Sequence, residues 1–214
     1  MRGKTHMAIG AGVGAATAVY YSADLSDFAI FIGVAAFSAL SADLDGPSML
    51  SSKLTKLSRR IREIALWGGV LFAAVLIYFF ITGQSISPLV AGGGIAAVLL
   101  GLTMKQGAIR NALVSLVGVY LIAQGIEREL AWLIGLGAFV VWAPWLKHRG
   151  MTHTIWIIPF WWWLGLGLEE QLQLEGLAWA AALGYLSHLA ADTLTPSGVK
   201  WLYPLINKSF KIKM

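Results

Sequence analysis

Long apolar blocks constrain this chain more than any other feature of its sequence. They cover residues 7–21, 25–42, 64–83, 88–104, 111–124, 130–146, 154–168 and 176–194. The mean hydropathy of +0.70 and the 57% share of hydrophobic residues are far above the values of soluble domains. Because the blocks are continuous rather than alternating, they predict membrane helices and not a membrane barrel. The expected fold class is therefore all-α, a polytopic membrane protein with about eight transmembrane helices.

Positive charge predicts how these helices are oriented. If both termini are placed in the cytoplasm and the spans alternate, Lys and Arg residues fall almost entirely on the cytoplasmic side, with Arg128 as the exception. Cytoplasmic loops of membrane proteins carry such an excess. We therefore expect a multi-pass protein of the inner cell membrane with both termini cytoplasmic and an uncleaved first span. The same pattern explains the pI of about 9.6, so no nucleic-acid partner is expected.

The segment 50–64 has a pattern of its own. Apolar residues recur at steps of four and three, and basic residues lie between them. The apolar positions are Leu50, Leu54, Leu57, Ile61 and Ile64, and the basic ones are Lys53, Lys56, Arg59, Arg60 and Arg62. This pattern predicts a basic amphipathic helix on the anionic lipids of the inner leaflet. The simpler alternative is a positively charged cytoplasmic loop.

Seven His and Asp residues interrupt the apolar pattern, and the predicted topology puts all of them on the cytoplasmic side. They are His6, Asp43, Asp45, His148, His153, His188 and Asp192. Ionisable groups at a membrane edge are costly unless they pair with one another or with a ligand. We therefore expect one polar site at the cytoplasmic ends of spans 1, 2, 7 and 8.

The residue types in this set favour a metal site. The chain has no cysteine, so a metal would be held by imidazole and carboxylate groups, which suit Zn and also Mn or Fe. His188 and Asp192 are four residues apart and project from one helix face. A single buried histidine is more often hydrogen-bonded than metal-bound, but here all four histidines of the chain share one side. Seven candidate ligands exceed the needs of one catalytic ion, which predicts two divalent ions, Zn before Mn or Fe.

Four motifs carry a resemblance to a known family. They are Thr5-His6, Asp43-Leu44-Asp45-Gly46-Pro47-Ser48, His148-Arg149-Gly150-Met151-Thr152-His153, and the segment from Gly184 through His188 and Asp192 to Thr195-Pro196-Ser197-Gly198-Val199 and Pro204. In these motifs and their order the chain resembles the inner-membrane-bound metal-dependent hydrolases, often called YdjM-like. Shorter members of that family run almost directly from the Asp-x-Asp motif to the His-Arg-Gly motif. The resemblance therefore implies one integral membrane domain over residues 1–214, with motif-bearing spans in 1–49 and 141–205 and an inserted four-span block at about 65–140.

The expected activity combines the site with the resemblance. We expect a metal-dependent hydrolase of a membrane lipid at the inner leaflet, acting on a phosphoester as a phosphatase or phospholipase C does, with a metal-activated water as nucleophile. The candidate catalytic residues are Asp43, Asp45, Arg149 and His153. Arg149 would hold the phosphate, with Lys147 or Lys200 as a further contact. The alternative is a non-catalytic metal-binding membrane protein, either a regulatory partner or a metal carrier. The sequence specifies neither the lipid nor the oligomeric state.

Overall fold

Helices make up most of the computed structural model, which describes residues 1–21, 24–84, 87–103 and 106–212. Within these residues there are eight α-helices, and each overlaps one of the predicted spans. They are α1 (Gly3–Tyr20), α2 (Leu25–Ser41), α3 (Ser52–Ile81), α4 (Pro88–Thr103), α5 (Gln106–Glu127), α6 (Ala131–Trp142), α7 (Ile157–Leu172) and α8 (Leu177–Thr193). The only β-type pairing in the described part of the chain is an isolated bridge between Val199 and Phe210. The all-α fold class is therefore confirmed. Met104, the predicted end of the fourth span, lies outside the described residues.

Among the described residues, three stretches are long and apolar enough to cross a membrane by length and composition. They are Leu25–Asp45, Ser52–Ile81 and Gly107–Glu127, and Ala131–Trp145 is a shorter apolar stretch. Large apolar side chains such as those of Trp67 and Phe80 are exposed on these helices. Exposed apolar surface on this scale is typical of helices that face lipid.

The chain divides into two compact units, which are described separately. The first consists of Met1–Ser52 and Val114–Met214, and the second of Lys53–Leu113. All seven predicted metal ligands belong to the first unit. In the second unit, α3 and α4 approach closely where Gly69 meets Val98.

The basic segment 50–64 differs from its prediction. A separate surface helix was expected there, but the segment forms the first turns of α3, which continues without a break for 30 residues. No Gly or Pro interrupts the chain between Lys53 and Trp67, so nothing ends the helix before the apolar part begins. A helix of this length extends for about 45 Å, whereas the apolar core of a bilayer is about 30 Å thick.

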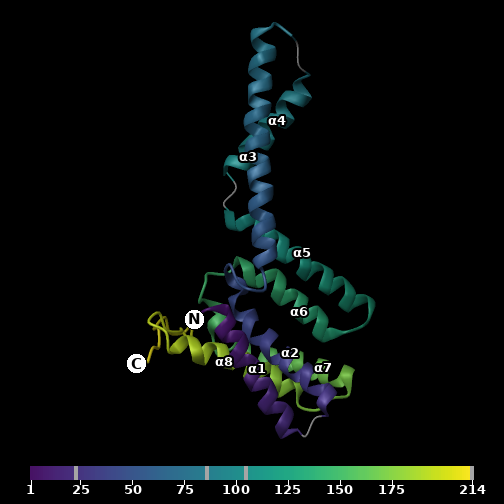
Figure 1. Cartoon of the computed structure of the whole chain (residues 1–214), viewed down its shortest axis with the longest axis vertical. Coiled ribbons are helices and arrows are strands. Elements are labelled where there is room, and N and C mark those ends of the chain that lie inside the picture. The colour runs from purple at the N-terminus through teal and green to yellow at the C-terminus, as the bar shows by residue number, and fades with distance from the viewer. Residues whose placement is uncertain (22–23, 85–86, 104–105, 213–214) are drawn as a thin grey trace. The chain divides into compact units, whose positions relative to one another are not determined.

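In the first unit, α1, α2, α7 and α8 lie side by side (Figure 1). Helix α8 contacts each of the other three, and α6 covers α7. One part of the core consists of Ala18, Phe31, Ala35, Leu177 and Ala180, all fully buried. These residues are mostly small, which lets the helix backbones come close together.

Two glycines set the spacing between α2 and its neighbours. A Cβ atom on Gly184 of α8 would lie 2.4 Å from the Ala35 carbonyl oxygen of α2. A Cβ atom on Gly14 of α1 would lie 2.5 Å from the Phe31 carbonyl oxygen. Both obstacles are backbone atoms, which cannot rotate away. The helix ends that carry the candidate site therefore depend on glycine at these two positions.

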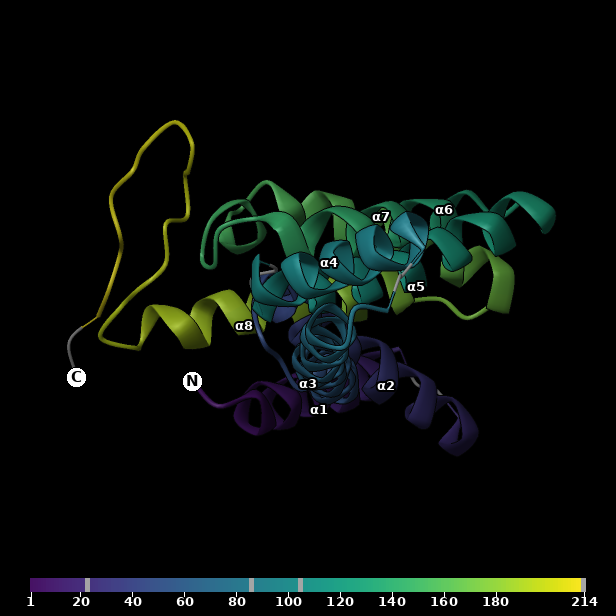
Figure 2. The same ribbon diagram turned by 90° about the horizontal axis from the view of Figure 1, so that it is seen from above.

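The candidate site lies where α1 begins and α8 ends, and Figure 2 shows the N-terminus close to that end of α8. Three short 3₁₀ segments contribute to it: η1 (Ala42–Asp45), η2 (Ala143–Trp145) and η3 (Met151–His153). Segment η1 contacts both η2 and η3. Helix α2 cannot continue through Gly46, because the residue before Pro47 is driven to the extended backbone that Gly46 adopts. The chain tightens into η1 instead, and both aspartates of the Asp-x-Asp motif lie in that turn.

We predict that Gly184→Ala lowers the free energy of unfolding by about 1–3 kcal/mol, because the added methyl group forces α2 and α8 apart. Gly33→Ala in α2 is the matched control, since nothing lies within 4 Å of its added Cβ. Thermal unfolding of the detergent-solubilised protein measures both. Equal midpoints for the two variants would show that the α2–α8 spacing does not depend on Gly184.

Candidate metal centre

Helices α1 and α8 bring three of the predicted ligands together. The His6 and His188 rings stack, with centroids 3.8 Å apart and planes 24° apart. The Nε2 atom of His6 lies 3.3 Å from Oδ1 of Asp192. All three side chains are buried. Buried polar groups of this kind need compensation, which a cation bound by the facing imidazole nitrogens and the carboxylate would provide.

Segment η3 adds His153, and η1 adds Asp43. The Nε2 atom of His153 lies 3.3 Å from Nε2 of His188 and 3.8 Å from both Asp43 Oδ1 and Asp192 Oδ2. The Nε2 atom of His188 lies 3.7 Å from Asp43 Oδ1 and 3.8 Å from Asp192 Oδ2. Two imidazoles and two carboxylates thus direct one atom each toward a common space.

These separations fit ligand atoms around a metal ion. Two ligands at about 2.0–2.2 Å from one tetrahedral ion lie about 3.3–3.6 Å apart. The ligand atoms group in three overlapping ways: His6 with Asp43 and His188; His153 with His188 and Asp192; and Asp43 with Asp45 and His148. Atoms within each group lie within 4.8 Å of one another. The donors, all imidazole nitrogen and carboxylate oxygen, suit a divalent transition metal.

The tautomer of His153 follows from its neighbour Thr152. The Thr152 hydroxyl donates its single proton to Oδ2 of Asp45 at 2.6 Å. The Thr152 oxygen also lies 3.0 Å from Nδ1 of His153, so it must accept a hydrogen bond from that nitrogen. The proton of His153 is then on Nδ1, and the free lone pair of Nε2 faces His188. A metal ligand needs this arrangement, in which a partner holds the other ring nitrogen.

Asp45 serves as the partner of several groups. Its Oδ1 accepts a hydrogen bond from Nδ1 of His148 at 2.7 Å, and its Oδ2 accepts one from the Arg149 backbone N–H at 3.0 Å. With the Thr152 contact, both oxygens are engaged. Asp45 is completely buried, whereas the His148 side chain is 55% exposed. The Asp45 hydrogen bond is the main cause that raises the pKa of His148 above its ordinary value.

Arg149 lies in a left-handed backbone conformation, with φ of 59°. This conformation, uncommon for a residue other than glycine, directs the backbone N–H to Asp45 while the side chain extends the other way. Its guanidinium pairs with Oδ2 of Asp192 at 2.8 Å and donates to Thr195 Oγ1 at 3.2 Å and to the Gly198 carbonyl at 3.0 Å. Arg149 therefore links Asp45, which follows α2, to Asp192 near the end of α8.

The structure thus brings together all seven predicted ligands and Arg149 in one network. Two residues of this network are accessible to solvent. The Asp43 side chain is 20% exposed, and the exposed fraction of the His148 side chain is larger. Sequence reasoning gave no separate role to Thr152 or Tyr185. The Tyr185 hydroxyl is buried and donates to the Thr152 carbonyl at 2.6 Å. Its position three residues before His188, on the same face of an apolar helix, is the signal that could have identified it.

We predict that Thr152→Val lowers the affinity for Zn about 10–100-fold, because His153 loses the nearer of the two oxygens beside its Nδ1, the other being Oδ2 of Asp45 at 3.4 Å. Thr154→Val is the matched control, since Thr154 is also buried but its hydroxyl bonds only to the Met151 carbonyl among the described residues. Competition with a chromophoric chelator measures the affinity. A Thr152→Val protein that binds Zn like the Thr154→Val protein would contradict this role.

Comparison with known proteins supplies the context for this site. No curated protein matches the chain, and no solved structure matches it. One family model, described as the YdjM inner membrane protein, matches residues 1–214, which is the whole chain. The resemblance in the sequence motifs is confirmed: the chain belongs to the YdjM inner membrane protein family.

Proposed function

We propose that this protein is a metal-dependent hydrolase that cleaves a phosphoester of a membrane lipid at the inner leaflet. The observation that carries the proposal is the group of converging ligand atoms from Asp43, His153, His188 and Asp192, which is buried except at Asp43. A buried cluster with one accessible carboxylate suits a reaction centre, since it excludes bulk water and leaves one approach for a substrate.

The residues divide into ligands and supports. His6, His153, His188 and Asp192 would hold the metal, with His148 and Asp43 toward the accessible side. A bound divalent cation supplies a water of lowered pKa and polarises the phosphoryl oxygen. We propose Zn for this role, with Mn or Fe as alternatives and two ions as the expected number, because three ligand groups overlap.

Asp43 is the best-placed general base. Its carboxylate has no hydrogen bond within the described part of the chain, in contrast to Asp45 and Asp192. It would accept a proton from the attacking water, whose oxygen bonds to phosphorus as the phosphorus–oxygen ester bond breaks. The departing alkoxide then takes up that proton. Asp45 and Arg149, first considered as catalytic, are engaged in contacts that favour a positioning role.

The inner-leaflet location rests on the distribution of Lys and Arg. The exposed basic side chains in the first turns of α3, Lys53, Lys56 and Arg59 among them, would bind anionic lipids of the same leaflet. The distribution of Lys and Arg supports a location of the metal cluster near the lipid headgroups of that leaflet.

We predict that Asp43→Asn lowers hydrolysis about 100- to 10,000-fold while the protein still binds metal, because a general base is lost and most ligands remain. The measurement is release of phosphate or phosphorylated headgroup from a panel of lipids in nanodiscs, with and without a chelator. Asp27→Asn, in the first turn of α2 and so at the end of that helix away from η1, is the matched control.

Two outcomes would decide against the proposal. Unchanged turnover by Asp43→Asn would remove Asp43 as the base. If the metal-loaded protein cleaved no lipid in the panel, the alternative, a non-catalytic metal-binding protein, would be supported. One observation favours that alternative: Asp192 is contacted on Oδ1 by the Met1 amino group at 2.9 Å and on Oδ2 by Arg149. A cluster closed by such contacts would have structural or regulatory use.

Orientation has its own test. We predict that a cysteine at Glu170 reacts with an impermeant thiol reagent added outside intact cells and that a cysteine at Lys208 does not. Both residues are exposed, and the natural chain has no cysteine to give background labelling. The reverse labelling would put the metal cluster at the outer face.

A further inference from the structure

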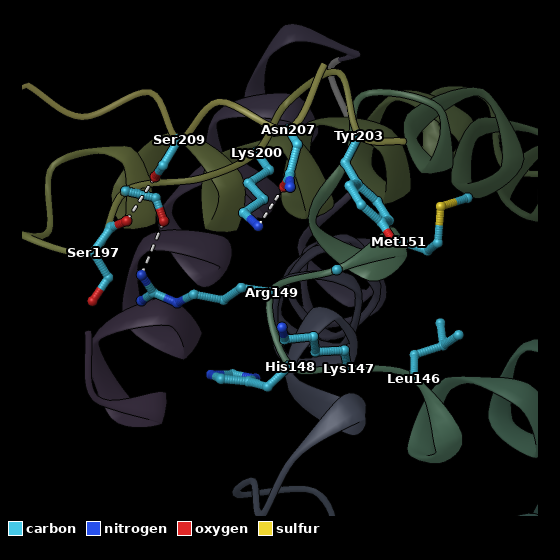
Figure 3. Close-up of a pocket in the computed structure, with 12 residues that line it drawn as sticks. Leu146, Lys147, His148, Arg149, Met151, Ser197, Lys200, Tyr203, Asn207 and Ser209 are labelled. Carbon is cyan, nitrogen blue, oxygen red and sulfur yellow. Dashed lines mark hydrogen bonds between the residues drawn. The ribbon is translucent and has the colours of Figure 1, made fainter. Parts of the chain in front are cut away.

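A second site adjoins the metal cluster. It is a cavity of about 320 Å³ between residues 146–151 and residues 197–209. Figure 3 shows the two segments on opposite sides of it. His148 and Arg149 line the cavity and also contact the metal ligands or their supports. The cavity therefore opens directly beside the proposed reaction centre.

The lining of this cavity is positively charged. Lys147, His148, Arg149 and Lys200 all contribute, and no Asp or Glu residue lies among the lining residues. The guanidinium of Arg149 is already paired with Asp192. The positive charges of the lining that have no acidic partner among the described residues therefore belong to the two lysines.

Neither lysine has an acidic partner in the described part of the chain. Lys147 is exposed. The Nζ atom of Lys200 donates to Oδ1 of Asn207 at 2.6 Å and lies 5.8 Å from the centre of the Tyr203 ring, and both of these groups are neutral. In Figure 3 both amines point into the space between the two segments. Two ammonium groups that line one cavity without an acidic partner would both attract an anion bound there.

The C-terminal segment is held in place as one wall. It leaves α8 and folds back on itself (Figure 2), and Val199 and Phe210 exchange backbone hydrogen bonds of 2.9 and 2.8 Å. The Ser209 hydroxyl donates to the Ser197 carbonyl at 2.7 Å. Gly198 has φ of +64°, and a Cβ atom there would lie 2.4 Å from the Phe210 carbonyl oxygen. These contacts within the folded-back segment keep Lys200 in the wall of the cavity without any contribution from a ligand.

We propose that this cavity binds a phosphate-bearing group, with Lys147 and Lys200 as its cationic contacts and Tyr203 and Asn207 as hydrogen-bonding groups. This inference rests on the proposed function and specifies how the proposed hydrolase selects its substrate. Lysine binds phosphate as a point charge. Because the cavity lining contains no carboxylate, it does not repel the negative charge of a phosphate. The volume is at the lower end of ligand sites, which span about 300–1,000 Å³, so a headgroup fits while acyl chains stay in the bilayer. Arg149 is then a positioning residue for Asp192 rather than a phosphate ligand.

Binding without turnover tests this inference. Chelator-treated protein in nanodiscs of zwitterionic lipid is titrated with three probes: inorganic phosphate, dihexanoyl phosphatidic acid and dihexanoyl phosphatidylcholine. We expect phosphatidic acid to bind best, and Lys147→Ala and Lys200→Ala each to weaken it about 10-fold. Lys200→Arg should retain most of the affinity, since the charge is kept. Lys208→Ala is the matched control, because it removes the same charge from the same segment outside the cavity.

The outcomes separate this inference from the hydrolase proposal. Equal affinity for inorganic phosphate and phosphatidic acid would assign the site to a free phosphate, and tighter binding of phosphatidic acid would assign it to a lipid headgroup. If Lys147→Ala and Lys200→Ala bound every probe like Lys208→Ala, the cavity would not be a phosphate site. Because no hydrolysis is measured, failure of the catalytic proposal would leave this result unaffected.

Discussion

Burial of ionisable groups at the end of an apolar helix bundle is the constraint on which this structure depends. His6, His153, His188 and Asp192 are almost inaccessible, and burial of such groups without compensation costs several kcal/mol. The bundle reduces that cost by bringing imidazoles and carboxylates within 3.3–3.8 Å of one another. A divalent cation at their centre would compensate the facing nitrogen and oxygen atoms together.

The scaffold achieves this convergence by two means. Glycines at the α1–α2 and α2–α8 contacts allow the backbones to approach until only main-chain atoms separate them. The loop before α7 is then fixed from both sides by Arg149, whose backbone N–H bonds to Asp45 while its side chain pairs with Asp192. One residue thus couples the end of α2 to the end of α8. Its left-handed backbone is the local strain that this coupling requires.

Much of this arrangement could be predicted from the sequence, because hydrophobic blocks and the positions of His and Asp are local properties of the chain. The eight blocks correspond to eight helices in the described residues. Because the predicted topology placed all seven candidate ligands on one side of the membrane, the sequence predicted that they would form one site. The continuity of α3 was missed, because a basic amphipathic pattern looks the same on a surface helix and on the extension of a longer one. The partners of Arg149 were also missed, since the sequence indicates a charge but not which anion it reaches.

The roles of Thr152 and Tyr185 show the same limit. Thr152 accepts the Nδ1 proton of His153 because Asp45, 107 residues earlier in the chain, takes its hydroxyl proton, and Oδ2 of Asp45 also lies 3.4 Å from that nitrogen. Tyr185 holds the Thr152 carbonyl across another long separation. Such contacts among three residues arise from the packing of η1, η3 and α8 and leave no periodic signal in the sequence. The inserted four-span block stays a prediction of the family resemblance.

X-ray absorption at the metal edge tests the central claim most directly, because it reports the atoms bound to the ion. For the protein purified from its native membrane or loaded with Zn, we predict a shell of nitrogen and oxygen at about 2.0–2.1 Å with the outer scattering of two or more imidazoles. The imidazole scattering should decrease in His153→Ala. Protein that holds no stoichiometric metal after loading, or that holds it without imidazole scattering, would contradict the assignment of this cluster as a metal centre.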